Sequence, residues 1–305
     1  MLEEPIPPRL AIFGCGYVGT AVAREARTRG WSVIALTRNP ARGAELRALG
    51  VEIVAADLAT DVWHAAVPRD QDHIVNCVSS GGGGLPGYWH SYVEGTQSIL
   101  RWAGAALPAN YVYTSSTSVY AQGGGETVSE DSPTGGGSEA SEPLLAAEKL
   151  VLESGVFRRS FVLRLAGIYG PERHYLLDQL RGGATHFPGT GTHRLNLVHR
   201  DDIVAAIFAC LDAPDTVRGG IFNVADDAAS AKGEVAGWLA RRLGVASPEF
   251  AHDRSEPASA PVSPVRGRSG PVPDRIISNA HLKDVLHWAP RYPDYRAGYE
   301  AILGA

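Results

Sequence analysis

The sequence predicts an α/β fold in which a doubly wound parallel sheet carries a small C-terminal lobe. Short apolar segments alternate with helical segments through the first half of the chain, a glycine-rich turn follows the first apolar segment, and the alternation loosens after Pro171. Such alternation is typical of a parallel sheet covered by helices on both faces. We therefore expect a main domain from residues 1–170 and 195–225, and a smaller lobe from residues 171–194 and 226–305.

Apolar runs and helix-ending glycines define the individual elements. Strands are expected at Leu10–Phe13, Trp31–Leu36, Val51–Ala55, His73–Val78, Tyr111–Thr114 and Phe161–Leu165, and later at Leu195–Val198 and Ile221–Val224. Helices are expected from the glycine-rich turn to Arg29 and over Ala41–Leu49, Tyr88–Ala106, Leu144–Ser154, Arg200–Leu211, Ala231–Leu243 and Ala280–His287. A glycine follows the first, second and fourth of these helices, as expected of a C-terminal cap. A stretch rich in Pro, Ser and Arg between residues 246 and 276 predicts a long loop.

Composition places the chain among ordinary globular proteins. It has 305 residues, of which 44% are hydrophobic and 20% charged, and its net charge is -5. Such a charge creates no field that recruits nucleic acid or anionic lipid, and no apolar run approaches the roughly 18 to 20 residues of a membrane helix. The first residues lack the basic and apolar regions of an export signal, and Cys15, Cys77 and Cys210 lack metal-ligand spacing. We expect a cytoplasmic protein with buried, reduced thiols that binds no metal, membrane or nucleic acid.

Gly14, Gly16 and Gly19 form a G-x-G-x-x-G pattern between the first strand and the first helix. This context predicts a dinucleotide site, because Gly14 permits the tight turn, Gly16 lets the backbone approach a pyrophosphate, and Gly19 lets helix and strand pack closely. The pyrophosphate would lie at the helix N-terminus, where free N–H groups and the helix dipole favour anions. The alternative is a glycine-rich turn that binds no ligand.

The end of the second strand favours NADP over NAD. It carries Thr37 and Arg38, and Arg42 follows one turn into the next helix. NAD-preferring proteins typically have an acidic residue here that binds the ribose hydroxyls, whereas a guanidinium pairs with the 2′-phosphate of NADP. Alternatively, Arg38 is an ordinary surface residue. Asp57, just after the third strand, is placed to contact adenine or to cap a following helix.

Several further motifs resemble, in their order, the extended short-chain dehydrogenase/reductase superfamily and its NAD-dependent epimerase/dehydratase group. They include Asp57-Leu58, Val93-Glu-Gly-Thr96, Tyr113-Thr-Ser-Ser-Thr-Ser-Val-Tyr120, Leu163-Arg-Leu-Ala-Gly-Ile-Tyr-Gly-Pro171, Asn196-Leu-Val-His-Arg-Asp-Asp-Ile203 and Phe222-Asn-Val224. The resemblance covers nearly the whole chain and implies a Rossmann domain with NADP or NAD as cofactor. The residues assigned to cofactor binding are Gly14, Gly16, Tyr17, Val18, Gly19, Thr37, Arg38, Asp57, Leu58, Val78, Ser79 and Lys149.

The same resemblance implies a small-molecule substrate with a hydroxyl or keto group, such as a nucleotide sugar, bound by the smaller lobe. It also implies catalytic roles for Ser116 and Lys149. In this family the Ser binds the substrate oxygen, while a Tyr and a Lys four residues later share one face of the next helix. The Lys position matches Lys149, so the Tyr position is Leu145, and no tyrosine occurs between Ala121 and Ile168. The chain therefore resembles an atypical member, and a homodimer packed through its long helices is implied by resemblance only.

The missing tyrosine leaves three interpretations open. The protein is an oxidoreductase or epimerase whose proton comes from another group, it binds NAD(P) without redox chemistry as a sensor or scaffold, or it uses the pocket for a different reaction. A general acid is usually worth about 10² to 10⁴ in rate, so its loss without replacement would cripple the usual mechanism. Groups near strand ends or the following loops that could replace it are Tyr120, Tyr169, His174, Tyr175 and His199.

Other features have both a functional and a structural interpretation. Four glycines, Gly81–Gly84, allow either a close backbone approach to the cofactor or a flexible loop. Arg164, in an apolar strand, is expected to form a structural ion pair, and Asp201 or Asp202 to cap the helix near Ile203. The arginines of the long loop would either close on an anionic substrate or stay solvated; they are Arg254, Arg266, Arg268 and Arg275.

Overall fold

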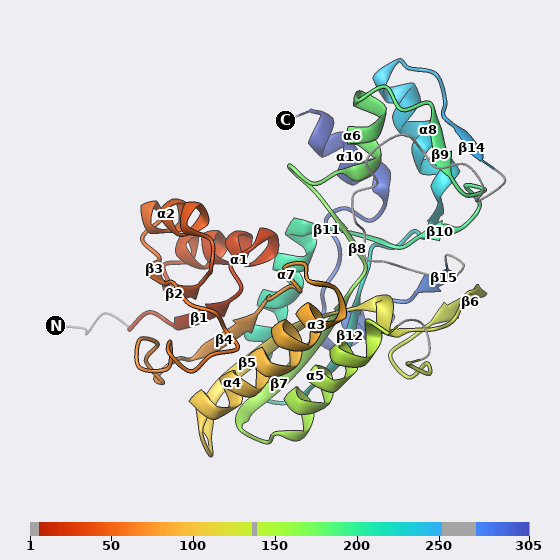
Figure 1. Cartoon of the computed structure of the whole chain (residues 1–305). Coiled ribbons are helices and arrows are strands. Elements are labelled where there is room, and N and C mark those ends of the chain that lie inside the picture. The colour runs from red at the N-terminus through yellow and green to blue at the C-terminus, as the bar shows by residue number, and fades with distance from the viewer. Residues whose placement is uncertain (1–5, 136–138, 252–272, 305) are drawn as a thin grey trace.

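The structure, a computed structural model, describes residues 6–135, 139–251 and 273–304. Within them, seven strands form one sheet in the order β12-β7-β5-β4-β1-β2-β3, and every neighbouring pair is parallel (Figure 1). The order changes direction between β1 and β4, which is where ligands bind in doubly wound sheets. This confirms the predicted fold class. The strands are β1 (Arg9–Phe13), β2 (Ser32–Leu36), β3 (Glu52–Val54), β4 (His73–Asn76), β5 (Leu107–Ser116), β7 (Phe157–Leu165) and β12 (Gly219–Val224).

Helices cover both faces of this sheet (Figure 1). One face carries α1 (Tyr17–Thr28), α2 (Pro40–Ala48) and α7 (Arg200–Leu211). The other carries α3 (Gly84–Tyr88), α4 (Gly95–Ala103) and α5 (Ser141–Glu153). Because the central strands are buried on both sides, they are continuous apolar runs rather than alternating ones.

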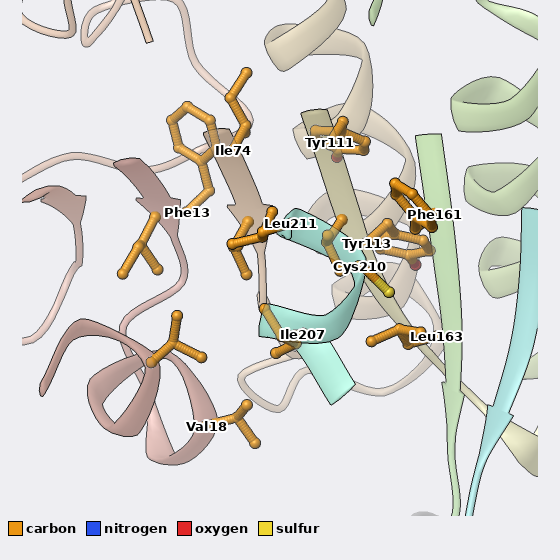
Figure 2. Close-up of a cluster of buried hydrophobic side chains, with 14 of the residues drawn as sticks. Phe13, Val18, Ile74, Tyr111, Tyr113, Phe161, Leu163, Ile207, Cys210 and Leu211 are labelled. Atoms are coloured by element: carbon orange, nitrogen blue, oxygen red, sulfur yellow. The ribbon is translucent and has the colours of Figure 1, made fainter. Parts of the chain in front are cut away.

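The main core lies between the sheet and its helices. Ile207, Cys210 and Leu211 of α7 belong to one buried cluster with Phe161 and Leu163 of β7 (Figure 2). All five are at most 2% exposed. Complete burial of one such aliphatic side chain contributes roughly 1.5–3 kcal/mol, so this layer holds α7 and the loop before it in place at the sheet.

A second, smaller core lies outside the sheet. It is built from apolar faces of α6 (Tyr175–Arg181), α8 (Lys232–Leu243) and α10 (Tyr295–Leu303), which lie together in Figure 1. By contrast, α9 (Ala280–Leu286) places Leu282 in the main core. The C-terminal segment thus contributes to both cores, and the exact domain boundaries stay a prediction.

Three segments differ from the sequence-based expectation. The expected helix Tyr88–Ala106 begins at the last residue of α3, continues through a π-helical turn η1 (Trp89–Glu94), and ends with α4 at Ala103. The expected strand Leu195–Val198 divides into β10 (Arg194–Leu195) and β11 (Leu197–His199), which pair with β13 (Ser230–Ala231) and β8 (Gly167–Tyr169), respectively. The expected loop 246–276 contains β14 (Glu249–Ala251) and most of β15 (Asp274–Ile277), paired with β9 (His186–Pro188) and β6 (Gly124–Val128). These short strands depend on tertiary pairing and carry no periodic signal of their own.

The three cysteines are free thiols, and burial raises the pKa of Cys15, Cys77 and Cys210. In the described part of the chain, no group of three or more His, Cys, Asp or Glu side chains is arranged to hold a metal ion. None of the helices in that part has both the length and the apolar character needed to cross a bilayer.

Candidate functional site

The glycine-rich turn between β1 and α1 is tightly packed at two glycines and open at the third. A Cβ on Gly14, where φ is +88°, would lie 2.6 Å from Cα of Val78, and one on Gly19 would overlap the carbonyl oxygen of Gly14. Apart from Gly16 and its neighbours in the chain, no described residue has an atom within 4 Å of the position that a Cβ would take on Gly16. This open position is what the close approach of a pyrophosphate requires, so the turn fits a dinucleotide.

The N-terminus of α1 has donors to offer an anion. Its N-cap is Gly16, which has no side chain to cap the helix, and its first turn contains no acidic residue. The N–H groups at Tyr17 and Val18 therefore keep their hydrogen-bonding capacity and the positive end of the helix dipole. The guanidinium groups of Arg173 and Arg200 lie 5.5 and 5.3 Å from the centre of the Tyr17 ring, which places two cations beside the turn.

A cavity of about 120 Å³ opens at the end of β2. Its charged lining residues are Arg38 and Arg47, and its remaining walls come from the end of β2, α2 and the edge strand β3. Arg42, which the sequence also suggested, does not line the cavity and pairs with Glu45 at 2.5 Å. A small cavity with two guanidinium groups suits an anionic substituent. The lining residues are Thr37, Arg38, Asn39, Pro40, Gly43, Arg47, Ile53 and Ala55.

Asp57 lies where several charges meet. Its carboxylate accepts hydrogen bonds from the Ala59 N–H at 3.0 Å and from Arg38 Nη1 at 3.1 Å, and it lies 3.2 Å from Nε2 of His90. Burial alone would raise the pKa of Asp57, but these three partners together lower it below its usual range. Asp57 closes a turn through Ala59, and the described residues between Leu58 and Gly83 contain no helix for it to cap.

The residues after β4 complete this edge. Val78 packs against Gly14, and Ser79 continues toward the glycine run Gly81–Gly84. All four of these glycines have φ between +60° and +97°, so the run has a defined left-handed conformation. Leu58, which the family resemblance placed at the cofactor, is 5% exposed and packs against α4.

Ser116 is the last residue of β5 and is half-buried. Its Oγ accepts a hydrogen bond from the N–H of Ser118 at 3.2 Å and caps the short 3-10 turn Thr117–Val119. Because that contact uses only a lone pair, the hydroxyl proton of Ser116 remains able to donate to a substrate oxygen.

Arg164 forms the expected ion pair. Its Nη2 lies 2.7 Å from Oε2 of Glu148, and both side chains are 4% exposed. Glu148 also accepts a hydrogen bond from Ser115 Oγ at 2.5 Å, and Arg164 donates to the hydroxyl of Tyr120 at 2.9 Å. This buried network joins α5 to β5 and β7 directly behind Ser116.

The candidate substitutes for the missing tyrosine differ in their surroundings. Tyr120 is committed to the Arg164 network and donates to Asn223 at 2.8 Å. Tyr169 and His199 are 3% and 2% exposed, and Tyr169 Oη and His199 Nε2 have no hydrogen-bond partner among the described residues. Burial lowers the pKa of His199 to about 4, so it is neutral at pH 7. The remaining two, His174 and Tyr175, lie at the start of α6, where Tyr175 is 44% exposed.

Arg275 and the N-cap of α7 differ from the sequence-based expectation. Arg275 is a buried residue of β15 rather than part of a closing loop, and it donates to the carbonyl oxygens of Tyr120 at 2.6 Å and Thr117 at 2.8 Å. Neither Asp201 nor Asp202 caps α7, because His199 is its N-cap and accepts from the Asp201 N–H. The other loop arginines, Arg254, Arg266 and Arg268, lie outside the described residues.

Comparison with known proteins agrees with this geometry. The model of the NAD dependent epimerase/dehydratase family matches residues 11–225, which is more than half of the chain. The chain belongs to this family. It is accordingly an NAD(P)-binding protein of the epimerase/dehydratase type.

One related protein and two solved structures each align with nearly the whole chain. Protein YeeZ of Escherichia coli strain K12 is 30% identical over 297 residues, which are 94% of this chain and 97% of YeeZ. The structure of a putative NAD-dependent epimerase/dehydratase from Methylobacillus flagellatus is 27% identical, with a TM-score of 0.72 and coverage of 98% of both chains. MoeE5, solved with UDP-glucuronic acid and NAD, has a TM-score of 0.79 and 23% identity over 96% of both chains, and thus shares the fold.

Lys149 and Glu148 face different sides of α5. Its side chain is 72% exposed, and Nζ lies 4.0 Å from Glu153 on the solvent side of α5. Glu148, one residue earlier, faces the sheet instead, and Leu144 lies one turn before it at 1% exposure. The helical repeat puts Leu144 and Glu148 on the sheet-facing side of α5, whereas Lys149 is turned to solvent. The assigned cofactor and catalytic roles of Lys149 stay a prediction.

The sequence-based interpretation missed three residues of this site. Glu148 could have been found from Arg164, because an arginine in a buried strand requires an acidic partner, and Glu148 lies one residue before the expected Lys. His90 precedes Glu94 by four residues, which is the spacing of a helical pair. Arg47 had no signal, because its place beside Arg38 depends on how α2 packs against β3.

Proposed function

We propose that the protein binds NADP in preference to NAD along the carboxyl edge of its sheet. The observation that carries this proposal is the cavity at the end of β2, with Arg38 and Arg47 in its lining. A 2′-phosphate gains charge-assisted hydrogen bonds from guanidinium groups there, and NAD has no group that does so. The glycine turn and the N-terminus of α1 would hold the pyrophosphate, and Thr37, Asp57, Val78 and Ser79 would surround the adenosine half.

Charge reversal at Arg38 tests this preference. A hydrogen bond to a charged group is worth about 1.5–3 kcal/mol, so Arg38→Glu should weaken NADP⁺ binding by about tenfold or more and change NAD⁺ binding much less. Arg42→Glu is the matched control, because Arg42 lies four residues later, in the first turn of α2, and outside the cavity. Fluorescence titration gives the dissociation constants of NADP⁺ and NAD⁺ for the wild-type protein and each variant. Equal weakening of both nucleotides by Arg38→Glu would show that the NADP assignment is wrong.

We further propose that the protein is an oxidoreductase or epimerase of a hydroxyl- or keto-bearing small molecule, such as a nucleotide sugar. A bound nicotinamide would supply hydride transfer to or from the substrate carbon. Ser116 would donate a hydrogen bond to the reacting oxygen, and the smaller lobe would hold the rest of the substrate. The fold shared with MoeE5, which was solved with a UDP-sugar acid, supports this substrate class.

The chain is, on this proposal, an atypical family member with a slow reaction. The position where the family resemblance calls for Tyr is Leu145, and the sheet-facing side of α5 presents Leu144 and an ion-paired Glu148. Without a general acid at that position, the rate should be lower by about 10² to 10⁴ than in a family member that has one.

The same face of α5 favours a second candidate, a sensor or scaffold that binds NAD(P) without turnover. Nicotinamide absorbance, measured during incubation with a panel of nucleotide sugars, distinguishes the enzyme from the sensor or scaffold. Turnover that Ser116→Ala lowers at least about tenfold, with cofactor affinity unchanged, supports the enzyme. Tight cofactor binding with no turnover on any member of the panel supports the sensor.

We propose, in addition, that the protein forms a homodimer through the α4–α5 side of the sheet. Leu152 of α5 and Trp89 of η1 are each 38% exposed there, and α5 packs against η1. Light scattering during size exclusion tests this, since Leu152→Glu should convert a dimer to a monomer. A monomeric wild-type protein would contradict it.

A further inference from the structure

The Arg38 side chain joins three loops at the carboxyl edge of the sheet. Arg38 follows β2, its Nη1 donates to Oδ2 of Asp57 after β3, and its Nη2 lies against Gly81 after β4. A Cβ on Gly81 would be 2.7 Å from that nitrogen, so the glycine leaves the space that the guanidinium fills. These are the same three loops that the proposed function assigns to the adenosine half of the cofactor.

The guanidinium of Arg38 therefore has two possible anionic partners, Asp57 and a bound 2′-phosphate. Its ion pair with Asp57 is made at 3.1 Å, with both side chains partly exposed. A 2′-phosphate in the adjoining cavity would compete with Asp57 for the same guanidinium. Any exchange of partners leaves the Asp57 carboxylate with one cation fewer.

His90 is the second partner of Asp57. Its Nε2 lies 3.2 Å from Oδ2 of Asp57, and its Nδ1 lies 2.8 Å from Oε2 of Glu94 on the same π-helical turn. A protonated imidazole donates from both nitrogens, whereas a neutral one has a single N–H and can satisfy only one of the two carboxylates. The hydrogen bonds to Asp57 and then to Glu94 raise the pKa of His90 above its usual value.

We propose that His90 is a positioning residue for cofactor discrimination, which holds Asp57 when Arg38 turns to the 2′-phosphate of NADP. The inference rests on the proposed function and deepens it. The charged groups that face His90 are Asp57 from the loop after β3, Glu94 from η1 and, through Asp57, Arg38 from the end of β2. When His90 is protonated, Asp57 keeps a cationic partner after the exchange. When His90 is neutral, Arg38 is the one cation left to Asp57 in this group, and the exchange is opposed.

The consequence is a pH-dependent preference between the two nucleotides. Because NAD has no 2′-phosphate, its binding demands no exchange of partners and depends less on His90. The ratio of NADP⁺ to NAD⁺ affinity should therefore fall as the pH rises through the pKa of His90. An exposed ion pair shifts an equilibrium by at most about fivefold, so the expected fall is about two- to fivefold.

Binding measurements from about pH 6 to about pH 9, which bracket histidine titration, test this directly. His90→Gln keeps a hydrogen-bond donor without the charge and should lose the part of the pH dependence that His90 contributes in the wild-type protein. Glu94→Gln removes one acidic partner and should move the inflection to lower pH. His64→Gln is the matched control, since His64 lies 3.4 Å from a different carboxylate, Asp61, and should behave like wild type. Titration of the 2′-phosphate itself is common to all four proteins and cancels in the comparison.

A second measurement uses the wild-type protein alone. By linkage, a nucleotide whose binding is favoured by protonated His90 must raise the pKa of His90. NMR titration of the His90 ring should give a higher pKa with NADP⁺ bound than with NAD⁺ bound. Equal pKa values, or a His90→Gln protein with the wild-type pH dependence, would overturn the inference while leaving the proposed function intact. Failure of both nucleotides to bind at every pH would overturn the proposed function and this inference together.

Discussion

Neighbouring residues on α5 should have very different effects on stability. Glu148→Gln removes the charge that compensates Arg164 inside the protein, where both side chains are 4% exposed. Removing one partner of a buried ion pair typically costs about 3–5 kcal/mol, because the other charge is left unpaired in a poorly polarisable interior. Lys149→Met removes an ion pair at 4.0 Å between side chains 72% and 67% exposed, which contributes at most about 1 kcal/mol.

Urea unfolding at pH 7 measures both changes. We expect a loss of about 3–5 kcal/mol in the free energy of unfolding for Glu148→Gln and a change within about 0.5 kcal/mol for Lys149→Met. The double variant Glu148→Leu with Arg164→Met should recover most of the loss, since apolar replacement of a buried pair is often neutral. Lys149→Met should also leave NADP⁺ affinity unchanged. Equal stability of the two single variants, or a marked loss of cofactor affinity in Lys149→Met, would refute the orientation of α5.

Further predictions concern the glycine turn, a buried acid and a buried arginine. Gly16→Val should abolish cofactor binding in fluorescence titration with little loss of stability, whereas Gly19→Val should lower the melting temperature, because only the Cβ at position 19 overlaps backbone. Burial raises the pKa of Asp226 to about 8, so the folded protein holds a proton that the unfolded chain releases near pH 4. The free energy of unfolding should therefore fall by on the order of 1 kcal/mol per pH unit between about pH 5 and about pH 8. Urea titrations of Asp226→Asn should lack this pH dependence. Arg275→Met should cost at least about 2 kcal/mol by removing the hydrogen bonds of Arg275 to the Tyr120 and Thr117 carbonyl oxygens, and an unchanged urea midpoint would contradict that role.

The sheet could be predicted because its strands carry strong local signals. The segments around Leu10, Ile74 and Val112 are continuous apolar runs, and parallel strands buried on both faces produce that pattern. The glycine turn could also be predicted, because a side chain at Gly14 or Gly19 would overlap backbone atoms. In both cases the residue type is dictated by contacts within the same local unit.

The remainder of the site depends on which face of a helix meets the sheet. Lys149 and Glu148 are neighbours in the sequence, yet their side chains lie about 100° apart around α5. The π-helical turn at Trp89–Glu94 likewise shifts the facing of His90, and no sequence pattern predicts such a turn. Arg275 was placed in a loop because its strand is short and exists only through pairing with β6.

Isothermal titration of ligand-stripped protein with NADP⁺ and with NAD⁺ tests the central claim most directly. The account predicts saturable binding of one nucleotide per chain, with NADP⁺ tighter than NAD⁺. Absence of binding heat for either nucleotide, from protein shown by circular dichroism to be folded, would contradict it.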